Sequence, residues 1–518
     1  MKTQVLIAGA GPTGLMMAAQ LQRWGIDFII IDNKDTITDK SKALAVQARS
    51  AEIFRQMGIA DEAVKRGSMA KALNLVVKDK VRAHIAFGNI GEGLSPYPYI
   101  LMLEQSKNEA LLNEYIQQHD GNVLWKHELL GFSDGDKGVT ANVKNAEGQT
   151  ISIQAHYLVG ADGAKSQVRH ILDLPFEGGT YEHVFFVADT KVNWKQHPDE
   201  LYVMFSLKTF SAFFPMSGES RFRMVGTMPE KFKEDGSVTF KDIEETVKAQ
   251  TDIPLTFSDT SWFSIYRVHH RVAGTFRKGN VFLAGDAAHV HSPVGAQGMN
   301  TGLQDAYNLA WKMAWALKGI AGSKLLDSYN EERHAIAKKL VETTDRLFSI
   351  VNDPGWWARL VRFHLVPLLA PILMHMNGFK RKIFKLASQI AVKYPDSPVS
   401  SGYIRKIKAG TRFPYFKWKA ADSDTYTDSF ELFKNSGLYV ITYDLKDVHL
   451  QLPPGVDCYQ LDIPVNDTNA AVLKKAGFSK CFICIVRPDC YIGYAKNKYE
   501  AAAVKEYLEK QLGLDMKK

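Results

Sequence analysis

The chain has 518 residues, of which 46% are hydrophobic and 23% are charged, and its formal net charge is +8. These values are typical of a globular protein, and this length predicts about two or three domains. No dense Lys/Arg segment alternates with aromatic residues, so we expect no nucleic-acid partner. The cysteines, Cys458, Cys481, Cys484 and Cys490, all lie near the C-terminus. Their number and positions argue against a disulfide framework and indicate a reducing, cytoplasmic compartment.

The chain offers no typical targeting or membrane-spanning segment. A single lysine precedes the short apolar run Val5–Ala10, which leads directly into a glycine motif, so we expect no signal peptide. The most lipid-like segment, Leu360–Met376, is interrupted by Arg362, two histidines and two prolines. It is too short to span a bilayer, and we expect it to pack against the protein and not to insert stably into a membrane.

The N-terminus predicts a strand, a glycine loop, a helix and a second strand. The strand Gln4–Ala8 leads into Gly9-Ala10-Gly11-Pro12-Thr13-Gly14, the helix Leu15–Trp24 follows, and the strand Asp27–Ile31 ends at Asp32. Glycines at this spacing permit a tight turn, close approach of a pyrophosphate and close helix packing, and an acid after the second strand can bind a ribose hydroxyl. This arrangement predicts an adenine dinucleotide site, but it does not distinguish FAD from NAD.

The next segments predict a mixture of helices and strands. We expect helices at Ser41–Met57 and Glu104–Gln118, strands within residues 70–101, and a hairpin of Val139–Val143 with Ile151–Val159. Lys42 and Arg49 are candidate phosphate contacts, and the alternative is that both are solvated helix charges, which carries nearly equal weight for Arg49.

A second glycine motif follows the hairpin. Gly160-Ala161-Asp162-Gly163 ends a strand, and Ser166 and Arg169 lie three residues apart on the helix expected next. An Asp-Gly turn alone is common. Between two other cofactor-like motifs, it becomes a third element expected near phosphate.

Residues 180–266 are rich in strand patterns and aromatic residues. The expected strands are Val184–Val187, Leu201–Leu207, Phe210–Phe214 and Arg221–Thr227. A sheet with one apolar face could form the roof of a substrate pocket.

A third motif then combines a strand, an acidic turn and a helix. Val281–Ala284 forms a buried-strand pattern, Gly285 and Asp286 end it, a Pro/Gly loop follows, and a helix is predicted from Met299. A carboxylate beside free N–H groups of a helix N-terminus suits a ligand with hydroxyls and an anion-accepting edge, as in a ribityl chain and a reduced flavin ring.

The rest of the chain predicts helices and a separate C-terminal unit. After Lys312 we expect helix to about Val392, broken at Asn352–Gly355, then a linker at residues 394–398. Residues 405–518 predict a small α/β unit with strands Gly437–Tyr443 and Cys481–Arg487 and a final helix Glu500–Leu512.

The three motifs, in this order, resemble the class A FAD-dependent aromatic hydroxylases, the group of para-hydroxybenzoate and phenol hydroxylases. Arg487-Pro488-Asp489-Cys490-Tyr491 resembles a signature of the phenol hydroxylase subgroup, with Cys490 replacing glycine. The resemblance implies an α/β fold: a Rossmann-like FAD-binding domain with an inserted β-sheet substrate domain, a helical segment, and a thioredoxin-like C-terminal domain. The expected boundaries are 1–178 and 267–400 for the FAD-binding domain with the helical segment, 179–266 for the substrate domain, and 401–518 for the C-terminal domain.

The resemblance also assigns expected roles to residues. The residues expected to bind the cofactor are Gly9, Gly11, Pro12, Thr13, Gly14, Asp32, Lys42, Gln105, Asp162, Gly163, Gly285, Asp286, Pro293, Gly298, Met299 and Asn300. Lys42 stands where the family commonly has arginine, which keeps the charge but loses the bidentate fork. Tyr266 and Tyr202 are the candidate catalytic residues, as bases that could deprotonate a phenol.

The implied reaction is hydroxylation of a phenol-like or polyketide-like aromatic substrate. NADPH or NADH would reduce FAD, and O₂ would form a flavin hydroperoxide that transfers its hydroxyl group. The alternative is another FAD-dependent oxidoreductase of the same fold, a reductase or an epoxidase of a non-aromatic substrate. We expect no metal at His289-Val290-His291, a structural and not a redox role for Cys481 and Cys484, and a possible homodimer.

Overall fold

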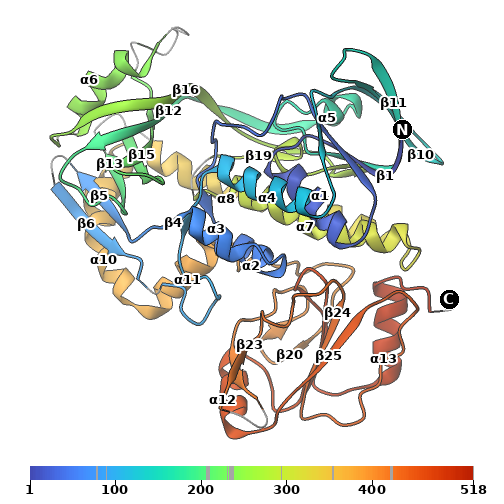
Figure 1. The fold of residues 1–518 in the computed structure, drawn as a ribbon. Helices are drawn as coiled ribbons and strands as arrows, with labels where there is room; N and C mark the ends of the chain where they lie inside the picture. The colour runs from blue at the N-terminus through green and yellow to red at the C-terminus, as the bar shows by residue number, and fades with distance from the viewer. Residues whose placement is uncertain are drawn as a thin grey trace.

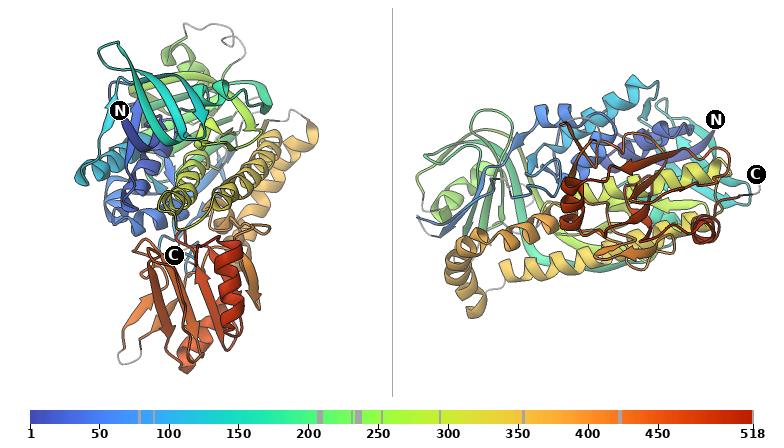
Figure 2. Two further views of the ribbon diagram at one scale, coloured as in Figure 1. Left: turned by 90° about the vertical axis from the view of Figure 1, so that its right-hand side faces the viewer. Right: turned by 90° about the horizontal axis from the view of Figure 1, so that it is seen from below.

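The computed structural model describes residues 1–77, 80–88, 90–205, 210–229, 232, 238–251, 253–292, 295–352, 355–420 and 424–516. A large body contains the chain through helix α11 (Asn377–Ala387), and the C-terminal unit lies against one side of it (Figure 1). Figure 2 shows the same arrangement from two further directions. The mixed α/β architecture expected from the sequence is confirmed.

The first sheet forms the centre of the nucleotide-binding domain. Its strands are β1 (Lys2–Ala8), β2 (Phe28–Asp32), β8 (Val123–Trp125), β9 (Glu128–Gly135), β10 (Gly138–Lys144), β11 (Thr150–Gly160), β17 (Arg277–Lys278) and β18 (Val281–Leu283). The strand order is β17-β18-β11-β1-β2-β8, and β9 and β10 extend β11 as an antiparallel hairpin. Val5, Leu6 and Ile7 of the central strand are fully buried, as expected for a parallel strand covered on both faces.

Helices cover this sheet and connect its strands. The helices of the body are α1 (Pro12–Arg23), α2 (Ala48–Gln56), α3 (Ala60–Arg66), α4 (Gln105–Gln118), α5 (Gln167–Ile171), α6 (Phe240–Thr251), α7 (Gly298–Leu317), α8 (Lys324–Asn352), α9 (Trp356–Leu360), α10 (Val366–His375) and α11 (Asn377–Ala387). Helix α1 packs against both α4 and α7. The glycine loop and the start of α7 are therefore held by one layer of helices.

The second sheet lies at the opposite end of the body, to the left in Figure 1. Its strands are β5 (Ala72–Val77), β6 (Lys80–Ala86), β12 (Phe176–Asn193), β13 (Leu201–Phe205), β14 (Phe210–Pro215), β15 (Arg221–Thr227), β16 (Thr256–Ala273) and β19 (His289–Val290), in the order β19-β16-β12-β15-β14-β13-β5-β6. Strands β12 and β16 each have 18 residues and pair along most of their length. The expected boundaries 178/179 and 266/267 fall within these strands, so the two domains share backbone. The last two residues of the expected strand Leu201–Leu207 lie outside the described residues.

The helix predicted from Ser41 begins later than expected. Ala45–Val46 forms strand β3, which pairs with β7 (Leu101–Met102), and β4 (Ser68–Met69) pairs with the other edge of β7. Only from Ala48 is the chain helical. The prediction for residues 41–47 was wrong because hydrogen bonds to a distant strand outweigh local helical preference.

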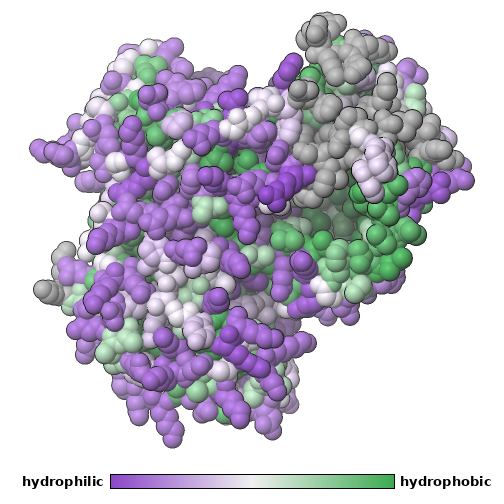
Figure 3. Space-filling model, turned by 180° about the vertical axis from the view of Figure 1, so that it is seen from behind, coloured by the Kyte–Doolittle hydropathy of each residue, from purple (hydrophilic) through white to green (hydrophobic). Residues whose placement is uncertain are grey.

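The lipid-like segment is also exposed to a degree that the sequence did not predict. Leu368 and Ile372 of α10 keep 64% and 57% of their surface exposed. Figure 3 shows a hydrophobic region on this side of the molecule. The expected packing against the protein applies to Pro367 and Met374, but not to the outer face of α10. No helix within the described part of the chain is long and apolar enough to cross a membrane.

The C-terminal unit contains a mixed sheet with helices packed beside it. Its strands are β20 (Ser401–Ile404), β21 (Ile407–Lys408), β24 (Leu438–Tyr443), β25 (Cys458–Ile463), β26 (Phe482–Val486) and β27 (Ile492–Lys496), in the order β21-β20-β27-β26-β24-β25, and β22 (Lys417–Lys419) pairs separately with β23 (Tyr426–Asp428). Helices α12 (Asp467–Ala476) and α13 (Ala501–Glu506) complete it. The link between β24 and β25 contains no helix, and the thioredoxin-like assignment of this unit stays a prediction.

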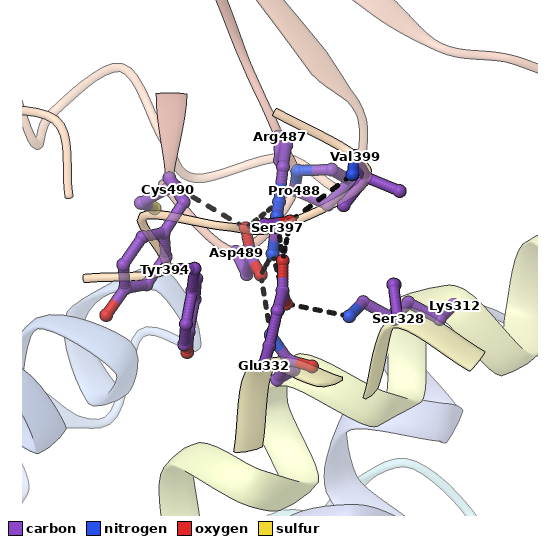
Figure 4. Close-up of polar contacts among 12 residues, drawn as sticks. Lys312, Ser328, Glu332, Tyr394, Ser397, Val399, Arg487, Pro488, Asp489 and Cys490 are labelled. Carbon is purple, nitrogen blue, oxygen red and sulfur yellow. Dashed lines mark hydrogen bonds and ion pairs between the residues drawn. The ribbon is translucent and has the colours of Figure 1, made fainter. Parts of the chain in front are cut away.

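A buried polar cluster joins this unit to the body (Figure 4). The Glu332 carboxylate accepts hydrogen bonds from Arg487 at 2.5 and 3.0 Å and from Lys312 at 2.8 Å. Burial alone would raise the pKa of Glu332, but the charges of Arg487 and Lys312 hold it well below its usual range.

Two further predictions are corrected at this interface. Arg49 is buried and donates to Glu52 and to the Asp489 carbonyl oxygen, so it bridges the two units and does not lie among the phosphate-proximal motifs. Tyr394, in the expected linker, is buried, and its hydroxyl accepts a hydrogen bond from Arg333. The linker is therefore part of the packed interface.

Candidate cofactor and substrate site

The three glycines of the first motif have three different surroundings. A Cβ on Gly9, whose φ is +102°, would lie 2.4 Å from the Ala161 carbonyl oxygen, and a Cβ on Gly14 would lie 1.9 Å from the Gly9 carbonyl oxygen. A Cβ on Gly11 would meet nothing within 4 Å. Gly9 and Gly14 are thus required by backbone packing, whereas Gly11 leaves the backbone open to a ligand.

Asp32 holds this loop from the end of β2. Its carboxylate accepts the Ala10 N–H at 2.6 Å and the Lys34 N–H at 2.9 Å. The acid therefore lies beside the glycine loop, where a dinucleotide ribose would be expected.

Thr13 connects the first motif to the third. Gly285, with φ of +62°, and Gly302 both approach it, and a Cβ on either would lie within 2.4 Å of the Thr13 Oγ1 atom. The half-buried side chain of Thr13 therefore packs directly against the glycines of the third motif. Pro12 is the first residue of α1 and presets the helical φ angle.

Asp286 lies in a short 3-10 turn directly after β18. Its side chain is exposed, although neighbouring protein is dense enough that desolvation raises its pKa, against the attraction of His289 and Lys42. Lys42 is itself exposed. An exposed carboxylate and an exposed ammonium close to the same helix N-terminus can receive the hydroxyl and phosphate groups of one ligand.

Gln105 orders the segment that carries Lys42. Its Oε1 atom accepts the N–H groups of Lys42 and Ala43 at 3.2 Å, and its Nε2 atom donates to Glu109 at 2.8 Å. The glutamine thus fixes the backbone beside the site.

Helix α7 begins at Gly298, and Gln297 makes no side-chain capping bond within the described structure. Asn300 is buried and bonds to Ala45, Ala296, Gln47 and Ser50, so its side chain fixes the protein chain and is not available to a cofactor. Met299 accepts a hydrogen bond from Asn108 through sulfur. Pro293 lies outside the described residues.

The second motif forms a helix cap. Asp162 accepts the Val168 N–H at 3.1 Å, and Ser166 accepts the Arg169 N–H at 3.0 Å. Gly163 has φ of +80° with open space at its Cβ position. One carboxylate oxygen of Asp162 therefore supports α5, while its Oδ1 atom has no partner among the described residues and the half-buried backbone at Gly163 has room for a ligand.

Two buried residues that the sequence did not single out for a role connect these motifs. Arg169 donates to the carbonyl oxygens of Ala287 and Ala164 at 2.8 and 2.9 Å. Asp305 accepts from the Gly285 N–H, His289 Nε2 and Arg333 Nε at 3.0, 2.8 and 2.6 Å. The spacing between Ser166 and Arg169 pointed to a role for Arg169. Asp305 joins α7 and α8, and no local sequence pattern indicates its role. No group of three or more metal-ligating side chains occurs within the described residues.

Two buried polar atoms near the start of α7 have no hydrogen-bond partner among the described residues. These are Gln47 Oε1 and His291 Nε2. Burial lowers the pKa of His291 to about 4, with a further contribution from His289, so its ring is neutral and this nitrogen is free to accept a hydrogen bond. Orphan acceptors beside a helix N-terminus fit a hydrogen-bonding ligand.

The face of the second sheet that includes Arg223 is directed toward the segment of Lys42 and Ala43 beside the candidate cofactor site. Arg223 forms a two-pronged ion pair with Asp189 at 2.8 and 2.7 Å and also donates to the Ala43 carbonyl oxygen. Tyr266 pairs with Phe185, which lies on the same face of β12 as Asp189. Tyr266 therefore lies on the site-facing side, as the catalytic prediction requires.

Tyr202 lies on the other face of this sheet, and its prediction is corrected. Pairing through Phe213 and Met224 places it with the apolar core under α6. Its hydroxyl accepts the His197 N–H at 2.9 Å and contacts Glu200. Successive residues of a strand point to opposite faces of the sheet, so the register of pairing decides that Tyr266 and Tyr202 lie on different faces. That register cannot be read from the sequence.

Comparison with known proteins identifies the family. The model of the family described as "FAD binding domain" matches residues 2–344. The 6-methylpretetramide 4-monooxygenase of Streptomyces rimosus is 33% identical over 77% of this chain and 71% of its own length. The pentachlorophenol 4-monooxygenase of Sphingobium chlorophenolicum is 32% identical over 68% of this chain and 65% of its own length.

Solved structures extend the likeness to the whole chain. Anhydrotetracycline hydroxylase from Streptomyces rimosus superposes with a TM-score of 0.77 at 25% identity, covering 99% of both chains. An aklavinone-11 hydroxylase, solved with FAD and aklavinone, has a TM-score of 0.81 at 22% identity over 99% of both chains, which shows the fold alone. The chain belongs to the FAD-binding family of class A aromatic hydroxylases and is an FAD-dependent monooxygenase.

Proposed function

We propose that this monooxygenase uses NADPH or NADH and O₂ to hydroxylate a phenol-like or polyketide-like aromatic substrate. The proposal rests on one observation above the others. The glycine loop, the Asp286 turn and the start of α7 present open or unpartnered groups toward the candidate cofactor site. The face of the second sheet that carries aromatic residues borders the same site. The named activities of its relatives, on pentachlorophenol and on 6-methylpretetramide, support an aromatic substrate.

The residues fit FAD in type and arrangement. The backbone at Gly11 and the Asp32 carboxylate would hold the ADP half, and Asp286 with Lys42 would hold the ribityl and phosphate groups. The first N–H groups of α7 would stabilise negative charge on the isoalloxazine ring. Bound FAD supplies the redox chemistry, taking electrons from the nicotinamide cofactor and delivering activated oxygen from O₂.

The sheet face supplies position for the substrate. Leu201, Phe214 and Met216 pack, partly buried, against Leu44 and Ala45 in a small apolar cluster that also includes Ala296 of the loop before α7. This cluster lies between the sheet and the α7 loop, and a flat apolar ring held there would exclude water from the reacting carbon.

Tyr266 acts in this proposal as a hydrogen-bond donor and not as a base. Burial raises its pKa to about 12, partly opposed by the positive charge of Arg223. A tyrosine that stays protonated at neutral pH can donate to a substrate oxygen, but it is a poor acceptor for a phenol proton. This changes the role expected from the sequence, while keeping the residue in the site.

The test is to measure oxygen uptake by the purified holoenzyme with NADPH or NADH and a panel of phenols and polycyclic phenols. We expect a substrate that stimulates oxygen uptake and yields a product with one added oxygen atom, with little hydrogen peroxide released. Oxygen uptake that yields only peroxide with every aromatic compound would argue against the proposal. Conversion of a non-aromatic alkene to an epoxide, or reduction of a substrate without O₂, would instead establish the alternative oxidoreductase.

A further inference from the structure

Helices α9, α10 and α11 carry large apolar side chains on their outer surface. The exposed members of this α9–α11 surface are Trp356, Trp357, Leu365, Val366, Leu368, Leu369, Ile372, Met376, Ile383 and Leu386. They belong to consecutive segments of the chain, and Figure 3 shows a hydrophobic region on the back of the molecule. Single exposed apolar residues are common, but a contiguous group of this kind marks an interaction site.

The geometry of α10 explains why this face has no cover. Leu365, Leu368, Ile372 and Met376 recur at intervals of three or four residues, so they lie along one side of the helix. Pro367 and Met374 lie on the opposite side and are buried, and α10 packs against β6 at the edge of the second sheet. The helix thus contacts the protein with its narrower side and directs its wider apolar side outward.

The same segment is strongly cationic. Between Asp353 and Asp396 the sequence has no Asp or Glu, but it has seven Lys or Arg residues, four of them in α11 at Lys380, Arg381, Lys382 and Lys385. None of these four forms an ion pair with a carboxylate of the described residues, although Arg381 donates to the Glu92 carbonyl oxygen. An apolar band and an uncompensated basic band therefore lie side by side.

The positive charge of the α9–α11 surface distinguishes between a second copy of the chain and a lipid surface as its partner. A symmetric contact between two copies would bring the same cations together on both sides, which is unfavourable. An anionic lipid surface complements both bands, since acyl chains accept the apolar side chains and headgroups neutralise the cations. The stacked pair Trp356 and Trp357, with ring centroids 4.3 Å apart, suits the boundary between headgroups and acyl chains. Helix α10 has only 10 residues, so it can lie in the interface but cannot cross it.

We propose that the α9–α11 surface docks this enzyme peripherally on an anionic lipid bilayer. The test is flotation of the FAD-loaded full-length protein with phosphatidylglycerol vesicles and with phosphatidylcholine vesicles, at low and at high salt. We expect binding to the anionic vesicles that weakens with salt. Leu368→Glu with Ile372→Glu should abolish this binding, and Lys380→Glu with Lys382→Glu should weaken it by about tenfold or more.

Matched variants in the C-terminal unit control for general effects. Val465→Glu changes a side chain that is 63% exposed, and Lys474→Glu with Lys475→Glu reverses the same number of charges on α12. Both should bind vesicles like the parent, and all variants should retain FAD and aqueous NAD(P)H oxidation. Absence of binding to anionic vesicles, or unchanged binding by Leu368→Glu with Ile372→Glu, overturns the proposal. Sedimentation equilibrium showing a dimer that this apolar-face variant disrupts, without vesicle binding, would assign the surface to a second copy.

Discussion

The two ends of helix α7 show two opposite ways in which a protein uses buried polar groups. Near Gly298, Gln47 and His291 each have an acceptor without a partner among the described residues, and Asp286 is exposed. Near the other end, Lys312 is fully buried and its charge is matched by Glu332. Unpartnered acceptors beside an open helix N-terminus indicate a ligand, whereas buried charges matched by opposite charges indicate a structural contact between the two units. Substitutions at the two ends should therefore change different measurements.

The largest effect on stability is expected from Glu332→Gln. The substitution leaves the buried Lys312 cation without a carboxylate partner and leaves Arg487 with Asp489 alone, and breaking such a buried pair costs about 3–5 kcal/mol. The free energy of unfolding, measured with urea on the holoenzyme, should fall by this amount. Glu431→Gln removes the ion pair between Glu431 and Arg55. Because the Glu431 side chain is 42% exposed, this loss should lower the free energy of unfolding by about 1 kcal/mol or less. Equal losses in the two variants would mean that the buried cluster is not a structural contact between the two units.

The same cluster predicts sensitivity to acid. The pKa of Glu332 is lowered below its ordinary value of 4.5, so its contribution to stability is complete above pH 4.5 and is lost as pH falls through the lower value. Glu332→Gln should therefore flatten the decline of stability below this pH. A decline of equal slope in both proteins would assign acid sensitivity to other carboxylates.

Gly14 and Gly11 separate packing from ligand contact within one loop. Gly14→Ala forces a Cβ against the Gly9 carbonyl oxygen and should cost about 1–3 kcal/mol of stability in the apoprotein. Gly11→Ala meets open space and should change apoprotein stability by less than about 0.5 kcal/mol. It should nevertheless weaken FAD binding, by titration of the apoprotein, by about tenfold or more, equivalent to about 1.4 kcal/mol. Unchanged FAD affinity in Gly11→Ala would place the pyrophosphate elsewhere.

Asp286→Ala should affect FAD affinity with little effect on the fold. Loss of a charge-assisted hydrogen bond of about 1.5–3 kcal/mol lowers affinity by about one to two orders of magnitude. Asp136→Ala removes an exposed carboxylate in the turn between β9 and β10 and serves as the control. Flavin fluorescence on dilution measures the dissociation constant in both. Full retention of FAD by Asp286→Ala would count against the placement of the ribityl chain.

The sequence predicted most of the elements near the cofactor because their signals are local. Glycine spacing, short apolar runs and helical periodicity located β1, α1, β18 and α7 to within a few residues. Arg49 and the segment before α2 were misread because their partners, Asp489 and β7, are distant in the chain. Tyr202 was misassigned because a one-residue change of register reverses the face on which a strand residue lies. Local chemistry is thus readable from sequence, and long-range pairing is not.

Tyr266→Phe tests whether the face of the second sheet that carries Tyr266 binds the substrate. Its expected effect is smaller than those of the substitutions above. Loss of one hydrogen bond to the substrate should reduce kcat/KM by about tenfold, since such a bond contributes about 1.4 kcal/mol. The loss should not depend on pH below about 10, because the pKa of Tyr266 is raised to about 12 and the residue stays protonated. Tyr202→Phe lies on the opposite face and should leave kcat/KM unchanged while lowering stability. A pH-dependent loss in Tyr266→Phe would restore the role of base.

The smallest effect on turnover is expected from Cys481→Ser with Cys484→Ser, which extends the comparison to the sulfur atoms of the C-terminal unit. All four cysteines are free. Cys484 is buried in β26, and Cys481 lies just before that strand, where its thiol donates to the Asn497 carbonyl oxygen at 3.1 Å. This corrects the expectation that both lie within the strand, but it gives neither thiol a path to the flavin site.

Burial also raises the pKa of Cys484, which disfavours the thiolate that disulfide exchange requires. We therefore expect kcat of the double variant to stay within about twofold of the parent, with a stability loss of about 1 kcal/mol from the polar hydroxyl at the Cys484 position. Steady-state turnover at saturating FAD, together with urea unfolding, measures both quantities. Cys458→Ser, at a partly buried thiol in the same unit, is the matched control. If turnover collapses only in the double variant while the fold and bound FAD are retained, these thiols carry electrons. The role of the C-terminal unit would then not be purely structural.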